Sequence, residues 1–266
     1  MMKSIIQLLR PCQWLKNVFV FLPLFFGGHL LDSTYSVNAF MMFVAFCLAD
    51  SGIYCFNDIC DAEDDKLPVS KTWGYAMMTL CFTLSLGLLF LFHLKNGKGA
   101  NVSLCMIVFY ILMNIIYCIK LKHIVLIDCL IVAIGYVLRV LGGGLSTGIL
   151  LSHWIVLLTF LLALFLAFAK RRDENLVLWD QLIAVVASLT MVCYILYTVS
   201  PEIMDRYQSS NLYITSLFVL IGIIRYLQLM IVDKITGSPM DVLLRDRMIQ
   251  MCVVGWSLTF WVLLYC

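Results

Sequence analysis

Long apolar runs alternate with short polar connections along this chain. Nine runs are candidate membrane spans: residues 18–31, 38–56, 73–94, 101–118, 124–147, 153–169, 182–200, 212–232 and 248–265. A helix needs about 20 apolar residues to cross a hydrocarbon layer of about 30 Å. The first run is short by this measure, and it contains Pro23. The pattern predicts an all-α integral membrane protein with about nine transmembrane helices.

The composition supports this prediction. The chain is 63% hydrophobic, its mean hydropathy is +0.99, and its net charge of +2 indicates no nucleic-acid partner. Residues 1–17 mix apolar side chains with basic ones, which predicts an interfacial N-terminal segment. We expect one polytopic membrane domain over residues 1–266. Most of the eleven cysteines lie within apolar runs and none forms a C-x-x-C pair, so we expect buried thiols.

Basic residues are distributed unevenly between the two sides that the runs define. With the N-terminus in the cytoplasm, thirteen Lys and Arg residues fall in cytoplasmic segments, and only Lys95, Lys98 and Arg206 fall in outer loops. Positive charge accumulates on the cytoplasmic side of membrane proteins. We therefore predict a multi-pass protein of the plasma (inner) membrane with a cytoplasmic N-terminus, an outer C-terminus and its chemistry on the cytoplasmic face.

The most acidic stretch, Asn57-Asp58-Ile59-Cys60-Asp61-Ala62-Glu63-Asp64-Asp65, begins where the second apolar run ends. On a helix, Asn57, Asp58, Asp61 and Asp65 lie within about a third of a turn of one another. Carboxylates this close repel one another unless a cation lies among them. Mg²⁺, usually shared with substrate phosphates, is the natural candidate. A solvated acidic helix end is the alternative interpretation.

Basic groups lie on the same predicted face. Lys170-Arg171-Arg172-Asp173-Glu174 follows the sixth run. It is either a stop-transfer cluster or a site for a polyphosphate, whose oxygens Lys and Arg hold. The segment from Arg10 to Asn17, before the first run, is either an interfacial anchor or part of that site. Acids and bases together indicate Mg²⁺-diphosphate chemistry, because a bound cation and flanking bases stabilise a departing diphosphate.

Two ionisable residues, Asp128 and Arg139, lie inside the fifth apolar run. Charges at this depth are costly, so such residues usually face a cavity or a partner. Three helical turns separate these two by about 16 Å along the axis, so we do not expect a direct pair. Arg139 either serves a phosphate ligand or forms an interhelical salt bridge, for example with Asp50.

With these groups in view, the chain resembles the UbiA-type prenyltransferase superfamily, through Asn57-Asp58-x-x-Asp61-x-x-x-Asp65 after the second predicted span. Its finer resemblance is to decaprenyl-phosphate phosphoribosyltransferases. The residues that carry the finer resemblance run through almost the whole chain: Arg10-Pro11-x-Gln13-Trp14-x-Lys16-Asn17, Leu121-Lys122 with Asp128, Gly135-x-x-Leu138-Arg139, Ser152-x-Trp154, Lys170-Arg171-x-x-Glu174, and Gly237-Ser-Pro239 with Asp246.

The resemblance implies a reaction in which a polyprenyl phosphate attacks phosphoribosyl diphosphate in the membrane and pyrophosphate leaves. It implies that Asn57, Asp61 and Asp65 hold Mg²⁺ and that Asp58 and Asp61 are catalytic. The substrate-binding residues that it implies are Lys16, Asn17, Lys122, Arg139, Lys170, Arg171 and Glu174. The lipid bilayer is a further partner, and a homo-oligomer is left open.

The chain departs from this family in two loops. The family typically has longer polar loops after both charged clusters, whereas here only Lys66–Thr72 and Asn175–Gln181 follow them. Such loops cap a site and exclude water, so we expect a more open site. A UbiA-type enzyme that prenylates an aromatic acceptor, a transporter or lipid-handling protein without catalysis, and an inactive relative are the alternatives. The net basic second cluster argues against the aromatic acceptor.

Overall fold

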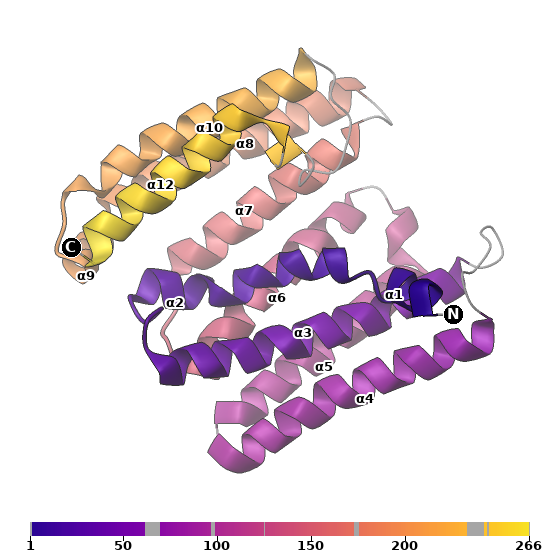
Figure 1. The fold of residues 1–266 in the computed structure, drawn as a ribbon. Coiled ribbons are helices and arrows are strands. Elements are labelled where there is room, and N and C mark those ends of the chain that lie inside the picture. Colours follow the sequence, from indigo (N-terminus) through magenta and orange to yellow (C-terminus); the bar gives the residue numbers. More distant parts are fainter. Residues whose placement is uncertain are drawn as a thin grey trace. The chain divides into compact units, whose positions relative to one another are not determined.

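The structure is a computed structural model that describes residues 2–61, 70–96, 99–124, 126–172, 176–232, 242–243 and 245–265 (Figure 1). Every regular element in these ranges is an α-helix or a 3₁₀ helix. The chain forms two compact units, Met1–Leu151 and Ser152–Cys266, and each has its own internal packing. The all-α prediction is confirmed for the described part of the chain.

The first unit is organised around one long central helix. Its elements are α1 (Met2–Leu9), the 3₁₀ helix η1 (Pro11–Phe21), α2 (Leu22–Gly27), α3 (Ser33–Cys60), α4 (Lys71–Asn96), α5 (Gly99–Ile119), η2 (Leu121–His123) and α6 (Ile127–Thr147). Helix α3 contacts α1, η1, α2, α4, α5 and α6. Its buried side chains, among them Met42, Phe46 and Ile53, form a core with Leu89 of α4 and Ile107 of α5.

A 3₁₀ helix replaces the predicted boundary between an interfacial segment and a first span. The prediction ended one element at residue 17 and began the next at residue 18, but η1 runs through both without a break. Its inner face is buried, and Asn17 and Val20 are fully inaccessible to solvent. A Cβ atom added to Gly143 of α6 would lie 2.0 Å from the carbonyl oxygen of Val20. Glycine therefore lets the backbones of η1 and α6 touch.

The second unit consists of α7 (His153–Lys170), α8 (Leu176–Val199), α9 (Pro201–Tyr207), η4 (Asn211–Ile214), α10 (Thr215–Ile231) and α12 (Arg247–Tyr265). Helix α7 contacts α8, α8 contacts α10, and α10 contacts α12. The side chain of Ser152 caps α7 by accepting a hydrogen bond of 3.2 Å from the backbone N–H of Trp154. This contact gives a local reason for the Ser152-x-Trp154 motif, because an N-cap serine satisfies an otherwise unpaired amide.

Seven helices in the described ranges are long and apolar enough to cross a membrane, so this is a multi-pass membrane protein. They correspond to the second to eighth predicted runs, and the shorter apolar helix Arg247–Leu263 corresponds to the ninth. The first run differs, because it is divided between the end of η1 and the short helix α2, which ends at Gly27 and is capped by Gly28 in a left-handed conformation. The count of nine spans is therefore not confirmed.

Candidate active site

The acidic residues gather at the carboxyl end of α3. Helix α3 ends at Cys60 with Asp61 as its C-cap, and Asn57 and Asp58 lie in its last turn. The amide nitrogen of Asn57 donates a hydrogen bond of 2.9 Å to Oδ2 of Asp61. Asn57, Asp58 and Asp61, which were predicted to share one face of a helix, thus lie in the last turn and C-cap of α3. Asp65 lies outside the described residues.

Each of the two carboxylates has a basic partner from another element. Nη2 of Arg10, between α1 and η1, lies 2.7 Å from Oδ1 of Asp58. Nζ of Lys122, in η2, donates to Oδ1 of Asp61. Three segments that are distant in the sequence therefore meet at the end of α3. The family resemblance implied a substrate-binding role for Lys122, and that role stays a prediction. Arg10 was noted in a motif but was not assigned to the site.

The oxygen donors at this helix end suit a hard cation. Asn57 offers an amide oxygen and Asp61 a carboxylate, and Mg²⁺ is usually bound through one or two carboxylates together with waters and substrate phosphates. Within the described residues, no three Asp, Glu, His or Cys side chains lie close enough together to hold a metal ion by themselves. Asn57 and Asp61 would therefore supply only part of the coordination shell of such an ion.

Tyr54 lies between two cations at the same end of α3. Its hydroxyl accepts a hydrogen bond of 3.1 Å from Nζ of Lys16. The guanidinium carbon of Arg10 lies 5.1 Å from the centre of its ring, and Nζ of Lys16 lies 5.8 Å from that centre. An aromatic face attracts such cations. Sequence reasoning missed Tyr54, although it lies one helical turn before Asp58.

Burial changes the acid–base behaviour of Lys16. The side chain lies in η1, outside the seven apolar helices, and removal of its ammonium group from water lowers its pKa below the ordinary lysine value. Nearby positive charge on Arg139 lowers this pKa further, whereas Asp50 raises it. A lysine in this state gains most from an anionic partner, because the anion stabilises the charged form.

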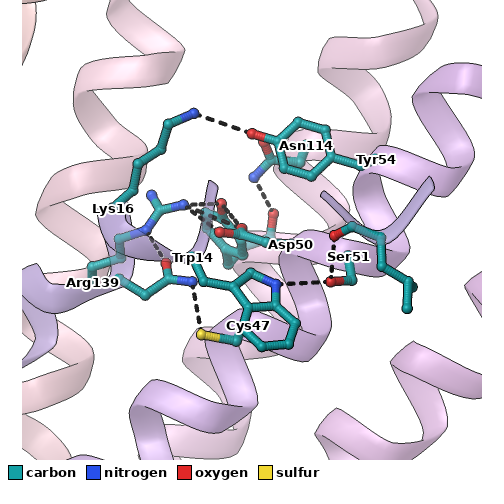
Figure 2. Close-up of polar contacts among 11 residues, drawn as sticks. Trp14, Lys16, Cys47, Asp50, Ser51, Tyr54, Asn114 and Arg139 are labelled. Atoms are coloured by element: carbon teal, nitrogen blue, oxygen red, sulfur yellow. Dashed lines mark hydrogen bonds and ion pairs between the residues drawn. The ribbon is translucent and has the colours of Figure 1, made fainter. Parts of the chain in front are cut away.

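Deeper in the first unit, η1, α3, α5 and α6 are joined by a buried polar network (Figure 2). Nη2 of Arg139 lies 3.2 and 3.1 Å from the two carboxylate oxygens of Asp50 and 2.6 Å from the hydroxyl of Tyr110. The Tyr110 hydroxyl donates to Asp50 at 2.6 Å. Nε of Arg139 donates to Oδ1 of Asn17 at 2.6 Å, and Nδ2 of Asn17 donates to Sγ of Cys47 at 3.3 Å.

This network bears on the two interpretations of Arg139 in the fifth run. The interhelical pair of Arg139 with Asp50 is confirmed, and the two side chains are 5% and 3% exposed. Asp128 accepts a hydrogen bond from the hydroxyl of Tyr117, and Arg139 binds elsewhere, which agrees with the expectation that these two do not pair directly. Asn17 is fully buried, and both polar atoms of its side chain are bound within the protein. The predicted substrate contacts of Asn17 and Arg139 stay predictions.

The second basic cluster lies in the second unit. Lys170 is the last residue of α7 and Arg171 is its C-cap. Arg172 is buried and donates to both carboxylate oxygens of Asp180, at 2.5 and 3.2 Å, and to the backbone carbonyl of Met230 at 2.6 Å. One arginine of the cluster thus ties the end of α7 to α8 and to the end of α10. Glu174 and Asp173 lie outside the described residues, as does the segment 237–239.

No protein-family model matches the chain. Several curated proteins, in contrast, are similar to it in sequence. The chain is 30% identical over 301 aligned positions to a decaprenyl-phosphate phosphoribosyltransferase of Mycolicibacterium smegmatis, and the alignment covers 100% of this chain and 93% of the relative. It is 29% identical to a protein of the same name from Mycobacterium tuberculosis, with 96% and 92% covered. It is 35% identical to one from Corynebacterium glutamicum, with 65% and 55% covered.

Among solved structures, one of a digeranylgeranylglyceryl phosphate synthase, a UbiA-type prenyltransferase, has the same fold. The TM-score is 0.60 at 14% sequence identity, and the superposition covers 98% of this chain and 94% of that one. At this identity the likeness concerns the fold. It agrees with the predicted UbiA-like helical bundle.

Proposed function

The chain belongs to the decaprenyl-phosphate phosphoribosyltransferase family of UbiA-type membrane transferases, and from this premise we propose that it transfers a 5-phosphoribosyl group from phosphoribosyl diphosphate to a polyprenyl phosphate. In this reaction a phosphate oxygen of the lipid forms a bond to the anomeric carbon of the ribose. The bond from that carbon to the diphosphate breaks, and pyrophosphate leaves with the electron pair.

One observation carries the proposal beyond family membership. At the end of α3, Asp58 and Asp61 pair with Arg10 and Lys122, and Lys16 binds Tyr54 one helical turn before Asp58. Acidic and basic side chains from distant parts of the chain thus lie together, which suits a metal-bound diphosphate. The carboxylates would hold the metal and the cations would hold the phosphate oxygens.

We assign the metal to Asn57, Asp61 and Asp65. When bound there, Mg²⁺ would neutralise the diphosphate and so make it a better leaving group. The carboxylate of Asp58, held by Arg10, would orient the ribose beside Asp61. The roles of Asn57, Asp58 and Asp61 are supported by their place at one helix end and by the partners that they have there, whereas the role of Asp65 rests on the family resemblance.

We assign phosphate contacts to Lys16, Lys122, Lys170 and Arg171, with Glu174 orienting the sugar hydroxyls. Lys16 is the strongest of these assignments, because its half-buried ammonium group reaches Tyr54 near the acidic end of α3 and desolvation lowers its pKa, so an anion would stabilise its charged form. Asn17 is left out of this set because both polar atoms of its fully buried side chain bind protein groups, and Arg139 is assigned no phosphate contact because its Nε and Nη2 serve the buried network. Positive charge along the chain supports a cytoplasmic N-terminus and a cytoplasmic site.

A reconstituted reaction tests the proposal. Purified full-length protein in detergent is incubated with Mg²⁺, polyprenyl phosphate and phosphoribosyl diphosphate labelled in the ribose. Labelled lipid and released pyrophosphate are the expected products. Intact protein that produces no labelled lipid, but prenylates an aromatic acceptor from a prenyl diphosphate, would overturn the phosphoribosyl assignment and leave the transferase fold standing.

Asp61→Asn tests the metal assignment. Loss of this carboxylate should lower the rate at least about 100-fold, since the cation loses a ligand and the leaving group loses charge compensation. Asp32→Asn is the matched control, because Asp32 caps the opposite end of α3 and asparagine caps equally well. Full activity in Asp61→Asn would refute the assignment.

A further inference from the structure

The buried network of the first unit performs no chemistry in the proposed reaction, yet it is costly to build. Transfer of a carboxylate and a guanidinium out of water costs several kcal/mol for each ion, and their attraction repays this only with good geometry and further hydrogen bonds. Asp50 and Arg139 lie inside α3 and α6, and rings of Phe46, Tyr110 and Tyr136 surround the guanidinium at 5.0 to 5.9 Å. An apolar pair would fill this space at less cost.

The network ends on η1. Arg139 binds Asp50 with one nitrogen and Asn17 with another, so a single guanidinium links α3, α6 and η1. Lys16 is the next residue to Asn17, and its ammonium group reaches Tyr54 at the acidic end of α3. Figure 2 shows the Lys16 side chain pointing to Tyr54 and the Arg139 guanidinium pointing to Asp50. The position of Lys16 is therefore tied to that of Asn17, which the network holds through Arg139.

The 3₁₀ form of η1 fits this attachment. Asn17 contacts Cys47, and Nε1 of Trp14 donates to Oγ of Ser51 at 3.0 Å. The two contacts are three residues apart on η1 and four residues apart on α3. Three residues of 3₁₀ helix rise about 6 Å, as do four residues of α-helix. The antiparallel elements thus stay in register, and Arg10 reaches Asp58 further along the same face.

We propose that Asp50, Tyr110 and Arg139 are positioning residues that hold η1 in this register through Asn17, and thereby place Lys16 for the phosphorylated substrate at the end of α3. Only the identity of that substrate rests on the proposed function. The network acts before any ligand binds, so its effect on Lys16 is measurable without substrate.

The first test measures the reactivity of Lys16 in the full-length protein in detergent. Reductive methylation is followed by peptide mass spectrometry, with exposed Lys71 of α4 as internal reference. The double variant Asp50→Asn/Arg139→Met removes both charges, which spares the fold the cost of one unpaired ion. Methylation of Lys16 relative to Lys71 should rise about fivefold or more, as expected for local opening of η1.

Leu89→Ala is the matched control. Leu89 belongs to α4 and is buried in the core of the same unit, so its truncation destabilises the unit without touching the network. Reactivity of Lys16 should stay within about twofold of the parent in this variant. An unchanged Lys16 in the double variant would overturn the proposal, as would an equal rise in Leu89→Ala. A residue that only touched substrate would leave the substrate-free reactivity of Lys16 unchanged.

The second test separates binding from chemistry. In the double variant, KM for phosphoribosyl diphosphate should rise about tenfold while kcat changes less than about threefold, because Lys16 contributes to substrate binding. Arg139→Lys keeps the charge opposite Asp50 but cannot also reach Asn17 with a planar fork. It should keep the melting temperature near that of the parent and still show the raised KM; a parental KM in this variant would contradict the proposal.

The two proposals fail separately. If the parent protein makes no labelled lipid, the reaction is wrong, and the methylation of Lys16 still decides whether the network positions it. If labelled lipid forms but Lys16 is equally reactive in the parent and the double variant, the positioning role is wrong and the reaction stands.

Discussion

The two units differ in how deeply their helices carry charged pairs. In the first unit, Asp50 and Arg139 lie inside long apolar helices and join four elements. In the second unit, two of the described pairs, Arg172–Asp180 and Arg225–Asp246, lie beside the starts of α8 and α12, and a third, Glu202–Arg206, lies within the short helix α9. Deeper contacts there join neutral groups, such as Tyr194 with Thr215 and Trp256.

This difference indicates what each unit uses its charges for. Pairs at helix ends secure the connections between helices at a lower desolvation cost, because at least one side chain of each pair stays partly exposed. A pair deep inside the helices is expensive, and buried ionisable groups in membrane proteins usually serve a functional site. In the first unit, the buried and therefore costly charges lie where the network contacts η1, the element that carries Lys16.

The largest effect is expected where η1 meets α6. Gly143→Ala would place a Cβ atom 2.0 Å from the carbonyl oxygen of Val20, and neither backbone can yield cheaply. We expect a loss of more than about 4 kcal/mol of stability, or no folded protein. Gly222→Ala in α10 is the counterpart in the second unit. Its Cβ would meet Cys252 at 3.7 Å, so alanine should be neutral or stabilise by up to about 1 kcal/mol. Thermal melting in detergent, followed by tryptophan fluorescence, measures both.

Removal of one buried charge should come next. Asp50→Asn leaves Arg139 without its counter-ion and should cost about 3 to 5 kcal/mol. Asp180→Asn in the second unit leaves Arg172 its bond to the carbonyl of Met230, and Asp180 is partly exposed, so about 1 to 2 kcal/mol is expected. Chemical denaturation measures the free energy of unfolding of both variants. Equal losses of stability would contradict the difference that we infer between the charged pairs of the two units.

A smaller effect concerns pH. Because burial lowers the pKa of Lys16, the fraction of charged Lys16 falls at a lower pH than for an ordinary lysine. Affinity for phosphoribosyl diphosphate should therefore be full below this lowered pKa and should fall by about tenfold as the pH rises through it. Lys16→Arg stays charged and should keep its affinity over that range. Isothermal titration measures the affinity of the parent and of Lys16→Arg for phosphoribosyl diphosphate between pH 6 and 10, about the range in which lysine and its shifted forms titrate. The same pH dependence of affinity in both proteins would contradict the prediction.

The smallest effect is expected at the start of α12. The Arg225 guanidinium donates two hydrogen bonds to Asp246 and lowers the pKa of this carboxyl, which also accepts from the backbone N–H of Ile249. A lowered carboxyl pKa contributes stability above the ordinary value of about 4, and this contribution is lost as the pH falls through the lowered pKa. Asp246→Asn should cost about 1 kcal/mol at pH 7, and its melting temperature should approach that of the parent in acid. A difference independent of pH would exclude the ion pair as its cause.

Much of this architecture could be predicted from the sequence. Apolar periodicity located seven helices, because length and hydropathy dominate in a membrane protein. The acidic cluster lies at the end of α3 as the pattern indicated, since a helical face is set by spacing alone. The pair of Asp50 with Arg139 was one of two interpretations, because a buried charge needs a partner.

Other parts could not be predicted. The hydrophobic pattern of residues 11–21 does not distinguish a 3₁₀ helix from an α-helix, because η1 gains its form from contacts with α3 and α6. Tyr54 and Tyr110 look like ordinary core aromatics in an apolar run, and only the tertiary structure shows that their hydroxyls meet Lys16, Asp50 and Arg139. For the same reason Arg172 could not be separated from its basic neighbours.

The backbone contact between Val20 and Gly143 also has a consequence for biogenesis. Residue 20 is synthesised well before its partner, residue 143 of α6. The backbone of η1 therefore cannot take its final place until α6 has been synthesised and inserted. During that interval η1 lacks the helix against which it packs, so the position of Lys16 is secured only after a later part of the chain has folded beside it.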